Sequence, residues 1–169
     1  GDVYKRQADR GGHRQALLPR PLAAQKWLHH NSRIMVSMST LLVTRNEDKS
    51  VTTSFEDGEF LGEGDLTVDV SYSSLNYKDA MAITGDPGVV RTNPLVPGID
   101  VVGTVSDSNV QRLPVGTLVA SFGDGLGEFR HGGYTPKQRV NSRATVALPA
   151  DFTAEQAAAV GTALSLIHI

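Results

Sequence analysis

The segment at residues 66–72 alternates between apolar and polar side chains with a period of two. Its apolar side chains fall on one face of an extended chain: Leu66, Val68, Val70 and Tyr72. Its polar side chains fall on the opposite face: Thr67, Asp69 and Ser71. Because successive side chains of a strand point to opposite sides, this pattern predicts a β-strand that is buried on one face.

Further short segments of the same type follow one another along the chain. Strands are predicted at residues 39–44, 101–105, 117–122, 137–140 and 145–148. Polar or glycine-containing turns at residues 46–49, 62–65 and 114–116 separate some of them. Short strands with a turn about every ten residues favour a mainly β barrel or sandwich.

Two helices are predicted among these strands. Tyr77, Ala80 and Met81 recur at helical spacing, which predicts a short helix within residues 75–83. Thr153 and Gln156 form a capping box ahead of a run of alanines, which predicts a second helix that reaches residue 160. We expect the apolar face of the second helix to pack against a following domain.

Composition excludes several classes of protein. The chain has no cysteine, so neither a disulfide scaffold nor a thiolate metal site is possible. No run reaches the 18 or so apolar residues of a membrane helix, so no membrane partner is expected. Residues 1–37 carry a net charge of +5 and residues 38–169 a net charge of −7. The acidic part argues against a nucleic-acid partner.

The two ends of the chain have an unusual relation to each other. Residues 2–7 can be encoded by codons whose reverse complement encodes residues 164–169, and the shared element resembles a transposase end sequence used in library preparation. We therefore expect residues 1–37 to combine an adapter-derived start with an untranslated or disordered leader. Residues 164–169 are the expected adapter-derived tail. Met35 or Met38 is the expected natural start.

Two blocks of residues resemble a known family. They are Ser-Ser-Leu-Asn-Tyr-Lys-Asp-Ala at residues 73–80 and Pro-Gly-Ile-Asp-Val-Val-Gly-Thr-Val at residues 97–105. Residues 82–85, 131–133 and 161–163 add to the likeness. From residue 38 to 163 the chain resembles the acryloyl-CoA reductase and quinone oxidoreductase-like branch of the medium-chain dehydrogenase/reductase superfamily.

The resemblance implies a mainly β fold, a GroES-like partly open barrel that serves as the N-terminal, alcohol dehydrogenase-type substrate domain. A Rossmann domain would normally follow, and we expect it to be missing from this chain. Residues 123–128 read Gly-Asp-Gly-Leu-Gly-Glu, where Glu128 stands in place of the third glycine of a dinucleotide fingerprint. We interpret them as a flexible loop, so the chain alone is expected to be inactive.

The resemblance also implies a function for the full-length parent. It would be a zinc-independent, NADPH-dependent oxidoreductase of the cytoplasm, a homo-oligomer that reduces the double bond of a 2-enoyl-CoA by hydride transfer. An NADPH:quinone oxidoreductase of the same fold is the first alternative. A non-enzymatic GroES-like binding module, such as a co-chaperonin ring subunit, is an alternative from another class.

Zinc is not expected at the position where related enzymes bind it. Zinc-dependent relatives have a His-Glu pair where this chain has Ile99 and Asp100. A catalytic zinc needs about three protein ligands, and His131 is the only histidine of the region predicted to fold. The interpretation of Asp100 stays open: it either hydrogen-bonds a nearby loop or acts near the substrate.

The resemblance places the candidate catalytic residues at Asn76, Tyr77 and Asp79. The reaction develops negative charge on a thioester oxygen, which requires hydrogen-bond donors and a proton source. On a helical turn Asn76 and Asp79 share a face, whereas Tyr77 points elsewhere and has a buried structural role as its alternative. Lys78 is expected in solvent. Thr162, in the closing Gly-Thr-Ala, is the expected cofactor-binding residue.

Overall fold

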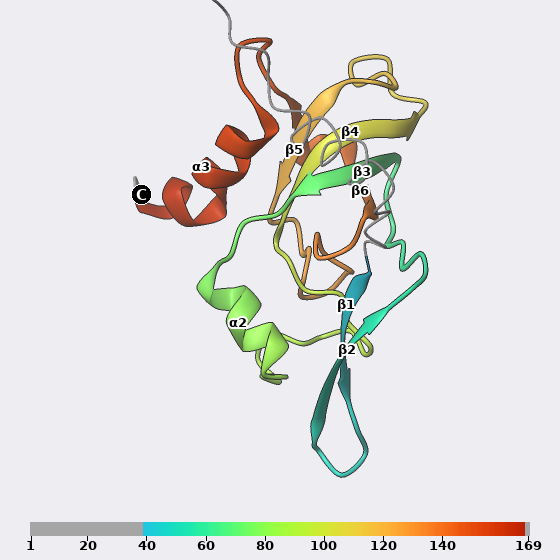
Figure 1. Cartoon of the computed structure of the whole chain (residues 1–169), viewed down its shortest axis with the longest axis vertical. Helices are drawn as coiled ribbons and strands as arrows, with labels where there is room; N and C mark the ends of the chain where they lie inside the picture. Colours follow the sequence, from blue (N-terminus) through green and yellow to red (C-terminus); the bar gives the residue numbers. More distant parts are fainter. Residues whose placement is uncertain (1–38, 168–169) are drawn as a thin grey trace, which may run out of the picture. The chain divides into compact units, whose positions relative to one another are not determined.

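The computed structural model describes residues 39–167. Five antiparallel strands form the larger sheet, in the order β6-β3-β4-β5-β7 (Figure 1). Their bounds are Leu66–Tyr72 for β3, Asp100–Ser108 for β4, Leu118–Phe122 for β5, Lys137–Val140 for β6 and Thr145–Ala147 for β7. The mainly β, GroES-like expectation is confirmed. The expectations for residues 1–38 and 168–169 lie outside the described residues.

A separate two-stranded sheet of β1 (Thr40–Arg45) and β2 (Val51–Glu56) is bonded to the segments that precede β4 and β6. Val43 and Leu95 exchange two N–H···O bonds of 2.8 Å, and the Leu41 N–H donates to the Tyr134 carbonyl at 2.9 Å. The sequence reading missed β2 because most of its side chains are exposed. A strand without a buried face has no apolar alternation to reveal it.

The core of the larger sheet confirms most of the alternation seen in the sequence. Leu66, Val68 and Val70 are buried together with residues of the neighbouring strands: Val101, Val105, Val119 and Val140. The placement of Tyr72 on that buried face is wrong, since its side chain is 45% exposed. The pairing of β3 with β4 shifts register between Val70 and Tyr72, and such an irregularity turns the following side chains to the other face.

The helix α3 (Ala154–Ile167) begins as the sequence predicts. The Thr153 N–H donates to Oε1 of Gln156 at 2.9 Å, and the Gln156 N–H donates to Oγ1 of Thr153 at 3.1 Å. The helix α3 also packs within the described residues, and its contact with a following domain stays a prediction. Its Ala157 and Ala158 are buried on the molecule's own sheet, against residues of β4 and β5: Val102 and Ala120.

Two further features position the site. The short helix α2 (Tyr77–Ile83) follows β3 and packs its Ala82 against Val89, Val90 and Leu95. The helix α3 is broken at Gly161, whose φ of 36° and ψ of −172° are not helical. Within residues 39–167, no helix has the length and apolar character needed to cross a membrane.

Candidate functional site

The start of α2 is held by a buried carboxylate. Oδ2 of Asp79 accepts hydrogen bonds from the backbone N–H of Asn76 at 2.8 Å and from its Nδ2 at 3.1 Å. Oδ1 of Asp79 accepts from the backbone N–H of Ile99 at 2.9 Å. Asp79 therefore caps the helix and ties it to the residue that precedes β4, and its full burial keeps it away from any ligand.

A second buried carboxylate, that of Asp100, lies next to the first. It accepts hydrogen bonds from Nδ2 of Asn76 at 3.2 Å and from the backbone N–H of Thr162 at 2.9 Å. The hydroxyls of Ser74 and Thr162 also donate to it. Of the two interpretations of Asp100, the hydrogen-bonding one is therefore observed, and full burial excludes direct contact with a substrate.

The side-chain NH₂ group of Asn76 is engaged by these two carboxylates, whereas its Oδ1 is buried without a hydrogen-bond partner among the described residues. Asn76 is only 7% exposed, and its Nδ2 lies within hydrogen-bond distance of Asp79 and Asp100. Carboxylate oxygens accept hydrogen bonds, so the amide atom that faces both side chains is assigned as the NH₂ group. Asn76 thus has no N–H left for a ligand oxygen, although its proximity to Asp79 is as predicted.

Tyr77 takes the opposite position. The alternative of a buried structural tyrosine is wrong, because the residue is 82% exposed. It lies at the edge of a cleft of about 510 Å³. The cleft is lined by the start of α2, Ile99, one loop and the residues after the kink in α3: Asn76, Tyr77, Lys78, Ile99, Gly123, Asp124, Gly125, Leu126, Glu128, Thr162 and Ala163.

Two charged groups on this lining pair with each other. Lys78 is exposed, as expected, and its Nζ lies 3.0 Å from Oε2 of Glu128. The pair links α2 to the loop on the other side of the cleft. Exposed ion pairs add little stability, so its main consequence is that both charges are locally balanced.

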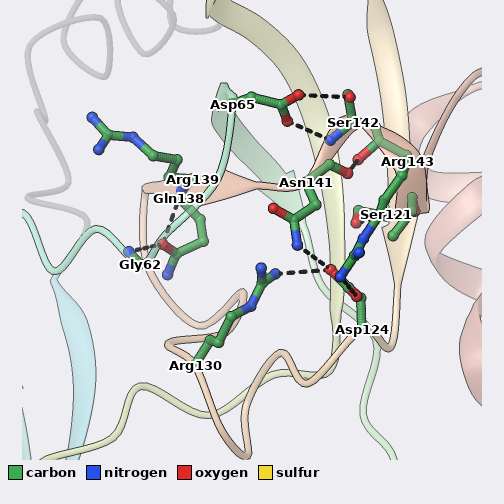
Figure 2. A network of polar contacts seen from close by, with 12 residues as sticks. Gly62, Asp65, Ser121, Asp124, Arg130, Gln138, Arg139, Asn141, Ser142 and Arg143 are labelled. Atoms are coloured by element: carbon green, nitrogen blue, oxygen red, sulfur yellow. Dashed lines mark hydrogen bonds and ion pairs between the residues drawn. The ribbon is translucent and has the colours of Figure 1, made fainter.

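The loop at residues 123–128 is held by polar contacts of Asp124 with neighbouring segments, as Figure 2 shows. Asp124, whose φ is 52°, accepts a hydrogen bond of 2.6 Å from Nδ2 of Asn141. It also pairs with Arg130 at 3.3 Å and Arg143 at 3.4 Å. These anchors hold the segment that we expected to be a flexible loop, and no helix follows it that would offer phosphate an N-terminus.

The donor set does not suit a catalytic metal. Among residues 39–167, no three His, Asp or Glu side chains are close enough to hold an ion. The Asp100 carboxylate, at the position of a zinc ligand in zinc-dependent relatives, is occupied by four N–H and O–H donors. Zinc independence stays a prediction, supported by this chemistry.

His131 is not part of the cleft lining. Because it is partly buried, we expect the stability of the fold to depend on pH. Burial lowers its pKa below the usual 6.5, and its Nδ1 accepts the Val96 N–H at 3.1 Å. Below about pH 6.5 the unfolded chain therefore gains a proton that the folded chain resists. As the pH is lowered below about 6.5, we expect the free energy of unfolding to decrease until His131 itself gains a proton in the folded state.

The measurement is denaturant unfolding across this pH range for wild type and His131→Asn. Asparagine keeps an acceptor near Nδ1 but does not titrate, so the curve of the variant should be flatter. The other four histidines remain in both proteins and cancel in the difference. Parallel pH curves for the two proteins contradict the prediction.

Comparison with known proteins agrees with the fold. The sequence profile of the alcohol dehydrogenase GroES-like domain matches residues 62–150. The chain belongs to this family. It is similar to the probable acrylyl-CoA reductase AcuI of Escherichia coli, with 42% identity over 127 residues that make up 75% of this chain and 39% of the relative. The acrylyl-CoA reductase AcuI of Ruegeria pomeroyi is 45% identical over 100 residues, or 59% of this chain and 30% of the relative.

Solved structures give the same result. The yhdH oxidoreductase of Salmonella enterica, in complex with NADP, matches with a TM-score of 0.70 and 41% identity over 74% of this chain and 39% of that one. The protein yhfP of Bacillus subtilis, with NAD bound, matches with a TM-score of 0.65 and 34% identity over 77% of this chain and 41% of that one. The chain thus spans about two fifths of these relatives or less, and its parent superfamily is that of the medium-chain dehydrogenases/reductases.

Proposed function

We propose that this chain is the substrate-side domain of a zinc-independent, NADPH-dependent reductase of 2-enoyl-CoA thioesters. The observation that carries the proposal is the cleft between Tyr77 and Thr162, in a chain that is 42% identical to a probable acrylyl-CoA reductase. Because the chain spans only 39% of that relative, the activity belongs to a longer protein. The 169-residue chain alone is expected to be inactive.

The cleft is proposed to receive a nicotinamide and an acyl chain. Ile99, Leu126 and Ala163 supply apolar surface, and apolar walls with a few polar groups are typical of cofactor sites. When bound, NADPH supplies the hydride, and the protein supplies orientation and electrostatics. Thr162, at the edge of the cleft, is proposed to contact the cofactor. The phosphate contacts would lie in the rest of the full-length protein.

Within this domain Tyr77 is the proposed catalytic residue. Its phenol is a hydrogen-bond donor and proton source on the exposed side of the cleft, where a thioester oxygen gains negative charge. Asn76 and Asp79 are proposed to act through Tyr77, because their hydrogen bonds hold the first turn of α2. In this proposal all three predicted residues contribute, and Tyr77 is the one that touches the substrate.

An NADPH:quinone oxidoreductase is the second candidate. A putative quinone oxidoreductase of Bacillus subtilis is 35% identical over 117 residues. A non-enzymatic binding module receives less support, because these relatives are named as acrylyl-CoA reductases or as a quinone oxidoreductase. A cytoplasmic location and a homo-oligomeric parent remain part of the proposal, and size-exclusion chromatography of the full-length protein checks the latter.

The deciding experiment compares two substrates on the full-length protein. We expect NADPH oxidation with acryloyl-CoA to exceed that with 1,4-benzoquinone by at least about tenfold in kcat/KM, a difference of about 1.4 kcal/mol. The 169-residue chain, assayed in parallel, is expected to show no turnover. Reduction of the quinone alone selects the alternative function. Absence of turnover with both substrates refutes the enzymatic proposal.

A further inference from the structure

We propose that Asp100 is a positioning residue that fixes the two sides of the cleft relative to each other. One side is the start of α2, which carries Tyr77. The other is the chain after Gly161, which carries Thr162 and Ala163. The carboxylate of Asp100 is buried beneath both and bonded to both. The role goes beyond the proposed function but rests on it, since it concerns the same cleft.

The bonds to the α2 side come from the segment that connects β3 to α2. Nδ2 of Asn76 donates to Oδ2 of Asp100 at 3.2 Å, and the Ser74 hydroxyl donates to the same oxygen. The backbone carbonyl of Asp100 accepts a further bond of 2.7 Å from the Ser73 hydroxyl. Asn76 immediately precedes Tyr77, so a shift of Asn76 moves the proposed proton donor.

The bonds to the α3 side depend on a glycine. A Cβ atom at Gly161 would lie 2.6 Å from Oγ of Ser74 and 2.9 Å from Oδ2 of Asp100, and the φ of 36° is a further obstacle to other residues. The kink in α3 therefore brings the backbone against the carboxylate. Thr162 then donates twice, from its N–H at 2.9 Å and from its hydroxyl.

Donors from both sides of the cleft converge on this carboxylate. Oδ2 accepts from the Ser74 hydroxyl, Nδ2 of Asn76 and the Thr162 N–H, and Oδ1 accepts from the Thr162 hydroxyl. An asparagine would present its NH₂ group either to the three donors on the Oδ2 side or to the Thr162 hydroxyl on the Oδ1 side, so in both orientations a bond to Thr162 is weakened. Asp100→Asn is therefore expected to separate Thr162 from Asn76 while it preserves the volume of the side chain.

The expected effect is on turnover rather than on cofactor binding. A displacement of about 1 Å at a site can cost about 10²-fold in rate. For the full-length protein with Asp100→Asn we expect kcat for acryloyl-CoA to fall by about that factor. The Kd for NADPH should stay within about threefold, less than ~1 kcal/mol. Asp107→Asn, at an exposed position of β4, is the matched control and should leave both values unchanged.

Hydrogen exchange provides a readout that does not depend on activity. In Asp100→Asn the amide of Thr162 should exchange faster, whereas the amide of Ala157, bonded to the Thr153 carbonyl at 3.0 Å in the first turn of α3, should not change. Thr162→Val removes one hydroxyl donor and keeps the side-chain shape. It provides a milder variant. In the double variant with Asp100→Asn, the fall in kcat should be smaller than the product of the two single effects.

Each arm has an outcome that overturns the proposal. Faster exchange at Thr162 with kcat unchanged shows that the tether does not position the reaction. A lower kcat with unchanged exchange at Thr162, or independent effects of the two substitutions, shows that Asp100 does not couple the two sides. If wild type reduces only quinones, the enoyl-CoA function fails, and the same comparisons made with the quinone still decide the role of Asp100.

Discussion

Tyr77→Phe is expected to lower turnover of acryloyl-CoA by the full-length reductase about 10²–10³-fold, the usual cost of losing one donor to a developing oxyanion. The reason is that the other two candidates are occupied: the amide hydrogens of Asn76 bond to carboxylates, and Asp79 is fully buried. NADPH affinity should be nearly unchanged. Steady-state kinetics and cofactor titration measure the two quantities separately.

Tyr72→Phe is the matched control for this experiment. Tyr72 is also an exposed tyrosine, but it lines a different hollow of the surface together with Phe55 and Tyr134. The full-length protein with Tyr72→Phe should keep its turnover within about threefold of wild type, less than ~1 kcal/mol. If Tyr77→Phe also stays within that range, the phenol does not take part in the chemical step and the proposed role of Tyr77 is wrong.

Gly103→Ala is expected to be the most destabilising small substitution in the sheet. Gly103 lies in β4 opposite Val70, and a Cβ atom there would lie 2.0 Å from the carbonyl oxygen of Asp69. Relief of this overlap requires the central pair of strands to move apart. Overpacking of this kind costs about 3 kcal/mol or more, which should lower the Tm by roughly 10 °C or prevent folding.

Gly116→Ala separates this steric effect from the loss of a glycine as such. Gly116 has a φ of +88°, but no atom lies within 4 Å of the position that a Cβ would take. Only the left-handed backbone conformation then opposes alanine, at a cost of about 1–2 kcal/mol. Thermal unfolding of the two variants checks the order. A smaller loss of Tm in Gly103→Ala than in Gly116→Ala contradicts the prediction.

The blocks that carry the resemblance also contain the residues of the cleft, which is why the sequence pointed to this region. The pattern did not show which atoms of these residues would be available to a ligand. Asn76 and Asp79 are polar and adjacent on a turn, a pattern that fits donors to a substrate as well as it fits a helix cap. The difference arises from Asp100, which lies 24 residues from Asn76 and takes up the remaining amide hydrogen.

The sequence by itself determined the features that depend on near neighbours. The alternation at residues 66–70 predicts β3, and the Thr153–Gln156 capping box predicts the start of α3, because both patterns reflect contacts within a few residues. Only the tertiary structure decided that the 123–128 loop is anchored, that β2 exists and that Thr162 reaches Asp100. Those contacts join segments as far as 62 residues apart, and their partners are chosen by how the sheet and the kinked helix pack, which no local pattern encodes.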